Sequence, residues 1–337
     1  MYKVAVVIPT LNEEKFISRC LDSVISQTYP FSDMDIMVID GGSLDRTREI
    51  VNEYNSKYPN IRLLINPGRI QSIAFNIGVK NSDAPYVIRL DAHATYDKGY
   101  VAGCLRPFSL TSVDLGCDPS QIGNVGGVWD IQPQHHGLIA ESSAILNQSK
   151  FGIGGAAFRV GATAGFVDTV PFGCFPRTVL NEVGGMREDL PRGEDNEFNS
   201  RIKKAGYKIY LDPRIVCTYF SRDTLKNNMK QMYANGESIG HLFYVDKESI
   251  GLRHLIPLLF VFGIIIGLLF SFWPPVCYAL MTGLSLYFLC DVFASLTAAN
   301  KFGWKYFFPL FMMFFCVHLS YGWGTIVGVF TGRKLKK

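Results

Sequence analysis

The sequence has no clustered cysteines, no basic run interleaved with aromatic residues and no apolar stretch after a basic start, and each absence argues against a class of protein. Its eight cysteines are scattered along 337 residues without a C-x-x-C pair, so we expect free thiols in or near the core instead of a disulfide framework. The net charge is +4, without a basic run interleaved with aromatic residues, so the excess points to anionic lipid or phosphorylated substrates and not to nucleic acid. No apolar stretch follows a basic start at the N-terminus, so no secretory signal is indicated, and we expect the polar part of the chain in the cytoplasm.

Charged residues are nearly absent from the last quarter of the chain. Between residues 255 and 299 the only formal charge is Asp291, and residues 306–330 carry none. A helix needs about 20 apolar residues to cross a hydrocarbon core of ~30 Å, and residues 255–272, 276–298 and 307–330 each approach that length. We therefore predict a membrane domain over residues 255–337, with two to three apolar helices and a basic tail.

The charges that flank these segments conflict with three full spans. Three spans would place the C-terminal basic cluster on the side of the membrane opposite to the polar part of the chain, whereas the positive-inside rule prefers that cluster in the cytoplasm. Either one apolar segment is interfacial or re-entrant, or the tail is an exception. The last segment is the most irregular candidate, because it contains Pro309, Gly322, Gly324 and Gly328. The basic residues concerned are Lys301, Lys305, Arg333, Lys334, Lys336 and Lys337.

Two hydrophobic periods alternate through the first hundred residues. Short apolar runs predict buried strands over residues 3–8, 35–39, 61–65 and 86–90, and helical spacing predicts helices over residues 14–27, 45–57 and 70–81. This alternation indicates βαβ units and a parallel sheet. Ligands of such sheets bind beyond the carboxyl ends of the strands, which selects residues 9–14, 40–45, 66–69 and 91–93.

The middle of the chain is glycine-rich and less regular. We predict a helix over residues 194–205, a strand over 208–211 and a polar helix over 224–247. The last of these is either an interfacial helix that leads to the membrane or an ordinary surface helix. The resulting domain prediction is an α/β domain over residues 1–222, an amphipathic linker helix over 223–254 and the membrane domain over 255–337.

An acid and a histidine stand two residues apart directly after the fourth predicted strand. Asp91 and His93 would project together where the chain turns, and such a pair can hold a divalent cation against a diphosphate. An oxygen-rich site with one imidazole favours Mn²⁺ or Mg²⁺ over zinc. The alternative is an exposed polar turn.

Four more charged residues stand at predicted strand ends or helix starts. Glu194 and Asp195 open a predicted helix, where a carboxylate either caps the helix or acts as a general base toward an attacking hydroxyl. Asp40 closes the second strand and would accept a hydrogen bond from a base N–H, and the alternative for this segment is helix capping by Ser43 or Asp45. Arg69 either faces a pyrophosphate or is an ordinary surface arginine. Within the membrane domain, Asp291 is either an acceptor contact or a structural partner in the bundle.

Six strings of the sequence, in this order, resemble the family 2 inverting glycosyltransferases with a GT-A fold. They are VVIPTLNEE (6–14), VIDGGSLDRT (38–47), NPGRIQSIAFNIG (66–78), RLDAHATY (89–96), VDTVPFG (167–173) and RGEDNEFNSRIKKAG (192–206). The chain is most similar to the bacterial succinoglycan-type exopolysaccharide glucosyltransferases, which share the Asp-Ala-His variant and the membrane tail. The fold that this resemblance implies is a Rossmann-like, mostly parallel sheet followed by membrane helices.

The resemblance also implies roles for the matching positions. Asp195 would be the catalytic base and Glu194 its supporting partner, while Asp91 and His93 would form the metal pair that is usually written Asp-x-Asp. The implied donor-binding residues are Pro9, Thr10, Asn12 and Glu13 of the first loop, Asp40 for the base, Arg69 for the phosphates, and Asp91.

The implied activity is an inverting, Mn²⁺- or Mg²⁺-dependent transfer of one sugar to a lipid-linked (polyprenyl diphosphate) acceptor in the synthesis of exopolysaccharide or another surface glycan. Glucose from UDP is the favoured donor sugar, although GDP-mannose or UDP-galactose would fit the same loops. The Gln-x-x-Arg-Trp signature of processive synthases is absent, and the nearest run is 231–235, which favours single additions. The expected location is the cytoplasmic membrane, multi-pass, with the catalytic domain facing the cytoplasm. The alternatives are a processive synthase with an export role and a non-catalytic nucleotide-sugar-binding subunit.

Overall fold

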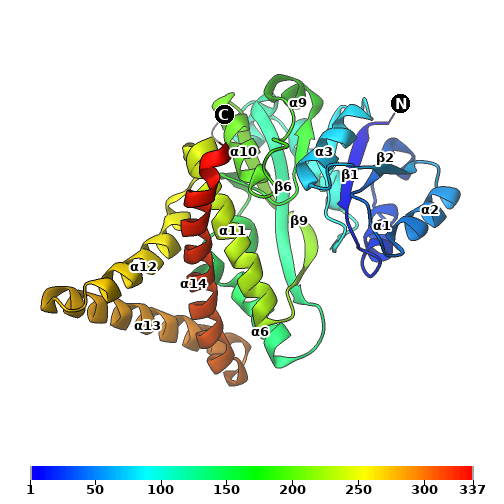
Figure 1. Ribbon diagram of the computed structural model, residues 1–337. Coiled ribbons are helices and arrows are strands. Elements are labelled where there is room, and N and C mark those ends of the chain that lie inside the picture. The colour runs from blue at the N-terminus through cyan, green and yellow to red at the C-terminus, as the bar shows by residue number, and fades with distance from the viewer. Residues whose placement is uncertain (1, 336–337) are drawn as a thin grey trace. The chain divides into compact units, whose positions relative to one another are not determined.

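The computed structural model describes residues 2–335, and the chain divides into two compact units (Figure 1). The first unit comprises Met1–Asp130 and Gly161–Tyr219, and the second comprises Ile131–Val160 and Phe220–Lys337. Residues 131–160 thus pack with the C-terminal helices, whereas we assigned them to the α/β domain. The domain boundaries at 222 and 254 stay a prediction.

The first unit is built on a mixed sheet that begins parallel. Strands β1 (Val4–Thr10), β2 (Met34–Asp40), β3 (Ile61–Ile65) and β4 (Tyr86–Arg89) pair in parallel, in the spatial order β3-β2-β1-β4. The sheet continues through β8 (Cys174–Pro176), β6 (Ile122–Pro133), β9 (Lys208–Ser221) and β5 (Ala94–Tyr96), and β7 (Gly165–Val167) pairs with β9. The pairs β4–β8, β6–β8, β5–β9 and β7–β9 are antiparallel. The predicted α/β class, with its GT-A type of sheet and its C-terminal apolar helices, is confirmed.

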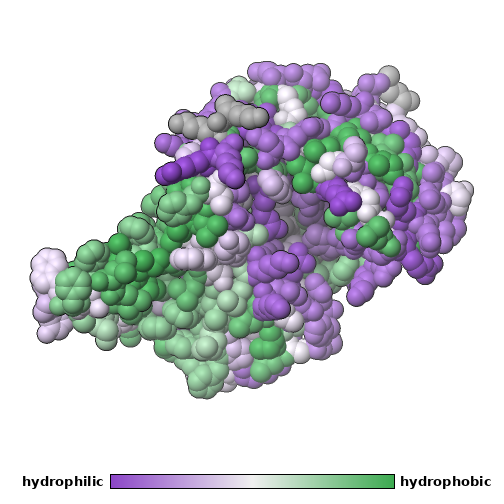
Figure 2. Space-filling model, viewed as in Figure 1, coloured by the Kyte–Doolittle hydropathy of each residue, from purple (hydrophilic) through white to green (hydrophobic). Residues whose placement is uncertain are grey.

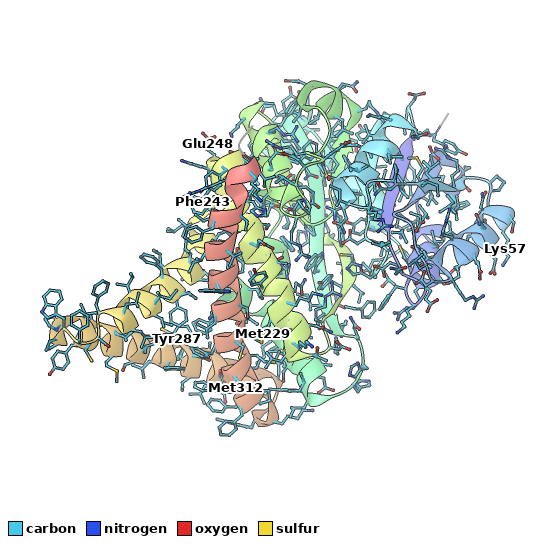
Figure 3. All side chains as sticks on the ribbon, in the orientation of Figure 1. Lys57, Met229, Phe243, Glu248, Tyr287 and Met312 are labelled. Atoms are coloured by element: carbon cyan, nitrogen blue, oxygen red, sulfur yellow. The ribbon has the colours of Figure 1, made fainter. Side chains whose placement is uncertain are left out.

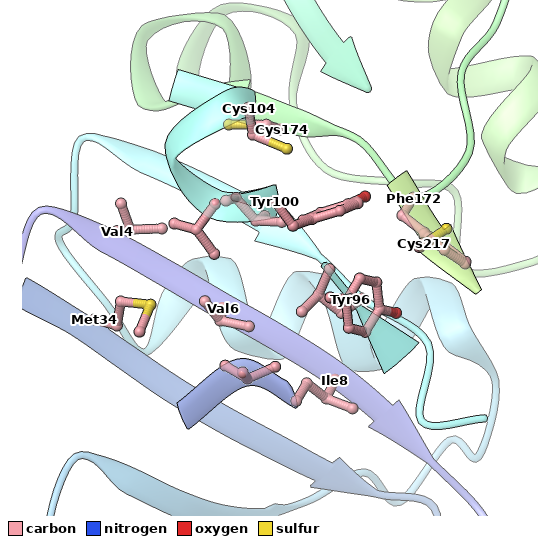
Figure 4. Packing of buried hydrophobic residues seen from close by; sticks show 14 of the residues in the cluster. Val4, Val6, Ile8, Met34, Tyr96, Tyr100, Cys104, Phe172, Cys174 and Cys217 are labelled. Carbon is pink, nitrogen blue, oxygen red and sulfur yellow. The ribbon is translucent and has the colours of Figure 1, made fainter. Parts of the chain in front are cut away.

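Helices cover both faces of the parallel strands. Successive side chains of each strand point to opposite faces, so they contribute to two separate hydrophobic cores. Val4, Val6 and Ile8 of β1 belong to one cluster, with helix α1 (Ile17–Ile25) and helix α2 (Thr47–Lys57). Ala5 and Val7 belong to the other, with α3 (Gln71–Lys80), α9 (Arg177–Val183) and α10 (Glu194–Lys204). Figure 4 shows the first cluster, in which Tyr96 and Tyr100 lie beside β1. Burial on both faces explains why β1 has the apolar sequence of a central parallel strand.

Shorter elements complete the described chain. The helices are α4 (Tyr100–Leu105), α5 (Ser112–Leu115), α6 (Leu138–Gln148), α7 (Lys150–Ile153) and α8 (Ala157–Val160), and the 3₁₀ turns are η1 (Phe31–Asp33), η2 (Arg106–Ser109), η3 (Pro119–Gln121), η4 (Lys247–Ser249), η5 (Trp304–Tyr306) and η6 (Gly332–Leu335). All eight cysteines lie in the described part and are free thiols, as predicted, and five of them are buried. Burial raises the pKa of the Cys20 thiol, which makes it a structural and not a reactive cysteine.

The second unit is helical and contains the apolar segments. It comprises α11 (Leu225–Val245), α12 (Leu252–Leu269), α13 (Pro274–Phe302) and α14 (Phe307–Thr331), together with α6, α7 and α8. Among the described residues, three helices are long and apolar enough to cross a membrane, and they coincide with the three predicted segments. Figure 2 shows hydrophobic surface gathered over α12 and α13.

The close packing of β6 on β9 generates a stability prediction. A Cβ added to Gly127 would lie 1.8 Å from the carbonyl oxygen of Ile215, so the backbone would have to move. We expect Gly127→Ala to destabilise the protein by about 1–3 kcal/mol, the typical cost of overpacking. The melting temperature of the purified protein measures this loss.

The matched control is Gly165→Ala, where an added Cβ meets nothing within 4 Å. The Gly165→Ala protein should have the melting temperature of the wild type. A Gly127→Ala protein that melts at the wild-type temperature would contradict the close approach of the two strands.

Candidate active site

The loops after β1 and β2 are tied together by hydrogen bonds between side chains and backbone. The amide of Asn12 donates to Ser43 Oγ at 2.8 Å, and the amide of Leu44 donates to Asn12 Oδ1 at 2.9 Å. The amide of Glu13 donates to Thr47 Oγ1 at 2.8 Å. Asn12 has a φ of 56°, a conformation that asparagine adopts more readily than most residues. These two loops therefore form one ordered edge beyond the carboxyl ends of adjacent parallel strands.

Asp40 anchors the second loop. Its side chain is fully buried and accepts hydrogen bonds from the amide of Gly42 at 3.0 Å, from the amide of Ser43 at 3.1 Å and from the Ser43 hydroxyl. Arg48 Nε lies 3.4 Å from the same carboxylate. These bonds fix the turn that follows β2, while contact between Asp40 and a nucleotide base stays a prediction.

Pro9 and Thr10 are the last two residues of β1 and pair in register with Ile39 and Asp40. Both are buried, and the Thr10 hydroxyl donates to the carbonyl oxygen of Ile8 at 3.1 Å. These two residues fix where the first loop leaves the sheet, and any donor contact from them stays a prediction.

The loop after β3 brings the backbone of Arg69 against the loop after β2. A Cβ added to Gly41 would lie 3.2 Å from the Arg69 carbonyl oxygen, so the absence of a side chain allows the two backbones to approach. Arg69 itself has a φ of 65°, which is uncommon for a large residue and often marks a functional site. Its side chain is exposed, so a cation stands beside the loop of Gly41 and Gly42.

Asp91 and His93 lie just beyond β4, where their motif predicted them. Asp91 Oδ1 accepts a hydrogen bond from Arg89 Nη2 at 3.1 Å, and the Asp91 amide donates to the Tyr96 hydroxyl at 2.7 Å. His93 Nδ1 is 3.3 Å from Glu13 Oε1, so a carboxylate of the first loop orients the imidazole. The side chains of Asp91 and His93 are 14% and 22% exposed, which leaves both accessible to a ligand.

Arg89, the last residue of β4, was missed by the sequence analysis and joins several of these groups. Its side chain is buried, Nη2 also donates to Gln71 Oε1 at 2.7 Å, and Nη1 lies 3.6 Å from Glu194 Oε1. One guanidinium thus connects Asp91 to the acid pair at the start of α10. The sequence did contain a signal for this role, since Arg89 is the single charge inside the otherwise apolar run 86–90. A charge buried in such a strand needs a partner of opposite charge.

Glu194 and Asp195 begin α10 but lie in different environments. Gly193 precedes them with a φ of 81°. Glu194 is buried, whereas Asp195 is exposed and accepts a hydrogen bond from the amide of Asn196 at 2.8 Å. Burial and the charge of Asp195 raise the pKa of Glu194 to about 7, against the opposing effect of Arg89. A buried acid with such a pKa beside an exposed carboxylate is a pattern that active sites favour.

Buried amides fix the position of α10, and the sequence analysis also missed them. Asn199 Nδ2 donates to Thr169 Oγ1 at 3.0 Å, and Asn124 Nδ2 donates to Asn199 Oδ1 at 2.9 Å. These bonds join α10 to β6 and to the segment after β7. Nothing local in the sequence relates Asn199 to Asn124.

The binding of a divalent cation by Asp91 and His93 stays a prediction. No group of three or more His, Cys, Asp or Glu residues that could hold a metal occurs within residues 2–335. Sites for Mg²⁺ commonly use one or two protein ligands and complete the shell with substrate phosphates and water. One carboxylate and one imidazole therefore fit a cation whose remaining ligands come from a diphosphate.

The class that this fold and these acids define is the GT-A glycosyltransferases. The family profile described as Glycosyl transferase family 2 matches residues 5–167. The protein is therefore a glycosyltransferase.

Curated relatives and a solved structure agree with this assignment. The dolichyl N-acetyl-alpha-D-glucosaminyl phosphate 3-beta-D-2,3-diacetamido-2,3-dideoxy-beta-D-glucuronosyltransferase of Methanococcus voltae is 29% identical over 77% of this chain and 79% of its own length. The succinoglycan biosynthesis protein ExoA of Rhizobium meliloti is 29% identical over 75% of this chain and 74% of its own. The mannosyltransferase PcManGT of Pyrobaculum calidifontis, solved with GDP-Man and Mn²⁺, has a TM-score of 0.60 at 17% identity, over 95% of this chain and 87% of that one. At that identity the last match concerns the fold alone.

The raised pKa of Glu194 generates a prediction about stability and pH. Its ordinary pKa is 4.5 and its folded-state pKa is about 7, so between these values the folded state holds a proton that the unfolded chain has released. The free energy of unfolding should therefore fall as the pH rises through this window. Glu194→Gln removes this dependence, so its melting temperature relative to wild type should be higher at pH 8 than at pH 5.

The matched control is Glu53→Gln, at an exposed position on α2. Its melting temperature should differ from wild type by the same amount at both pH values. A Glu194→Gln protein that also shows a constant difference would contradict the buried, proton-binding state of Glu194.

Proposed function

We propose that this glycosyltransferase transfers one sugar, with inversion, from a nucleoside diphosphate donor to a lipid-linked acceptor. The observation that carries the proposal is the linked set of acids at the carboxyl edge of the parallel strands. Buried Arg89 contacts both Asp91 and Glu194, and Asp195 is exposed next to Glu194. An exposed carboxylate held beside such a set is suited to take a proton from an attacking hydroxyl.

In the proposed reaction, the acceptor oxygen attacks the anomeric carbon while the bond to the diphosphate breaks. Asp195 takes the hydroxyl proton, and its position at the start of α10 is held by the bonds of Asn199 to Thr169 and Asn124. Glu194 supports it from the buried side. One displacement on the face opposite to the leaving group inverts the anomeric configuration.

The first three loops form the proposed donor site. The loop of Asn12 and Glu13 and the loop of Asp40 would hold the nucleoside, and exposed Arg69 would offset phosphate charge. Asp91 and His93 would hold Mn²⁺ or Mg²⁺, which when bound stabilises charge on the departing diphosphate. Glu13 would keep the His93 imidazole oriented toward that ion.

The named relatives support the acceptor class. One is named for a dolichyl-phosphate-linked sugar and one for succinoglycan biosynthesis. For this chain we propose a polyprenyl-linked acceptor and a UDP-sugar, with UDP-glucose first. Turnover of a panel of UDP- and GDP-sugars, with and without Mn²⁺ and with a lipid extract as acceptor, tests the donor.

Asp195→Asn tests the catalytic base. The substitution keeps the shape and removes the basic oxygen, so transfer should fall by about 10²–10⁴-fold while donor affinity stays at the wild-type value. Product formation and donor titration measure the two quantities separately. Asp189→Asn, in the exposed loop before α10, is the matched control and should keep wild-type transfer; wild-type transfer by Asp195→Asn would remove Asp195 from the mechanism.

Asp91→Ala tests the proposed metal and diphosphate contact. We expect this variant to lose the increase in donor affinity that Mn²⁺ gives the wild type, because the carboxylate ligand is gone. Calorimetric titration of UDP-glucose with and without Mn²⁺ measures that increase. Asp97→Ala, at an exposed position beyond β5, should retain it, and an undiminished increase in Asp91→Ala would count against the assignment.

The length of the product separates the proposed reaction from its alternatives. A single added sugar supports our proposal, whereas a polymer ladder would favour a processive synthase. Donor binding without any transfer would favour a non-catalytic subunit. We also propose a cytoplasmic face for the catalytic domain, since the donors are nucleotide sugars.

A further inference from the structure

The three apolar helices of the second unit differ in how much of their surface the protein covers. α12 buries only Val261 and Gly267, and α13 buries only Asp291, Ser295 and Ala299, whereas α14 buries eight residues along its length. Figure 3 shows side chains of α12 and α13 projecting on all sides. Helices that expose apolar side chains nearly all round are suited to a lipid environment.

α14 lies against α11 through contacts at glycines. A Cβ added to Gly324 would lie 2.1 Å from the carbonyl oxygen of Tyr233, and one added to Gly328 would lie 2.1 Å from that of Glu237. The contacts advance in the same direction along both helices, so α11 and α14 run parallel, side by side (Figure 1). Any depth in a membrane that α14 reaches is therefore shared by α11.

α11 is unsuited to a hydrocarbon environment. It carries Lys226, Lys230 and Glu237 along its length, and it is not among the described helices that are apolar enough to cross a membrane. Ionised side chains are costly in the bilayer core. Since α11 must stay outside the hydrocarbon core of the bilayer, α14, which packs along it, must also stay outside.

The exposed face of α14 fits a position in the plane of the membrane surface. Its exposed large apolar side chains are Phe308, Met312, Trp323 and Phe330. They are separated by about one, three and two helical turns, so they form one stripe. A helix covered on one side, with an apolar stripe on the other, is typical of interfacial helices.

We propose that α12 and α13 form a helical hairpin that enters the bilayer, and that α14 remains at the membrane surface on the side from which the hairpin enters. This inference does not depend on the chemistry of the active site. The chain then crosses into the bilayer and returns, so the first unit and the C-terminus share one side of the membrane.

The dimensions and composition of the hairpin fit this arrangement. α12 has 18 residues, which gives a length of about 27 Å against a hydrocarbon core of ~30 Å. The tip, residues 270–273, carries no charge and exposes Phe272 and Trp273. A Cβ on Gly267 would lie 2.8 Å from Leu280 Cδ1, so the two arms pack closely near the tip.

The returning end of the hairpin is anchored outside the hydrocarbon. Lys305 Nζ lies 3.1 Å from Glu141 Oε2 on α6, and the Tyr306 hydroxyl donates to the same carboxylate. Lys301 follows the last buried turn of α13. A hairpin places these lysines and the basic tail on one side, which resolves the conflict between three spans and the positive-inside rule.

The test is thiol labelling of the full-length protein in intact and in permeabilised cells, with a maleimide that cannot cross membranes. Three single variants place a cysteine at exposed positions: Lys57→Cys on α2, Ser271→Cys at the hairpin tip and Lys334→Cys after α14. The wild-type chain, labelled in parallel, gives the background from the native thiols. Labelling in detergent shows that all three introduced thiols react.

We expect Lys334→Cys to label under the same condition as Lys57→Cys, since both lie on one side. Ser271→Cys should be protected in membranes or should label only from the opposite side. Labelling of Lys334→Cys from the side opposite to Lys57→Cys would overturn the proposal in favour of three spans. Labelling of Ser271→Cys from the same side as Lys57→Cys would overturn insertion of the hairpin.

Discussion

The buried guanidinium of Arg89 is the interaction on which the candidate active site depends. It brings a positive charge to the end of β4, where Asp91 and Glu194 would otherwise be acids close to the core without a counter-charge. Removing one member of such a group leaves the others desolvated and unpaired. The same side chain connects two motifs that lie about a hundred residues apart, so the geometry of the acids is set by a residue to which the motifs gave no role.

Local periodicity was sufficient to predict the N-terminal half of the fold. The alternation of short apolar runs with helical spacing predicted β1 to β4 and the helices between them, because parallel strands buried on both faces have an unmistakable composition. The antiparallel half was not predictable in this way. β5, β7 and β8 are three residues each, which is too short for a period, and their pairing depends on partners far away in the sequence.

The candidate site was predictable where a single motif contains the chemistry, as at Asp91 and Glu194. The contacts between motifs were not, as the pairing of Glu13 with His93 and the amide chain through Asn199 show. Hydropathy likewise located three apolar helices but did not distinguish the two that expose most of their surface from the one that packs on protein. The glycines that made α14 look irregular are the positions where it approaches α11 and α12.

The paired loops after β1 and β2 have a consequence for how quickly the proposed nucleotide donor would be captured. Their hydrogen bonds to each other are complete without a ligand, and the unusual backbone angles of Asn12 and Arg69 are held by the surrounding fold. The loss of chain entropy that a flexible loop would suffer on binding has therefore already occurred during folding. A rigid rim of this kind favours rapid lock-and-key recognition.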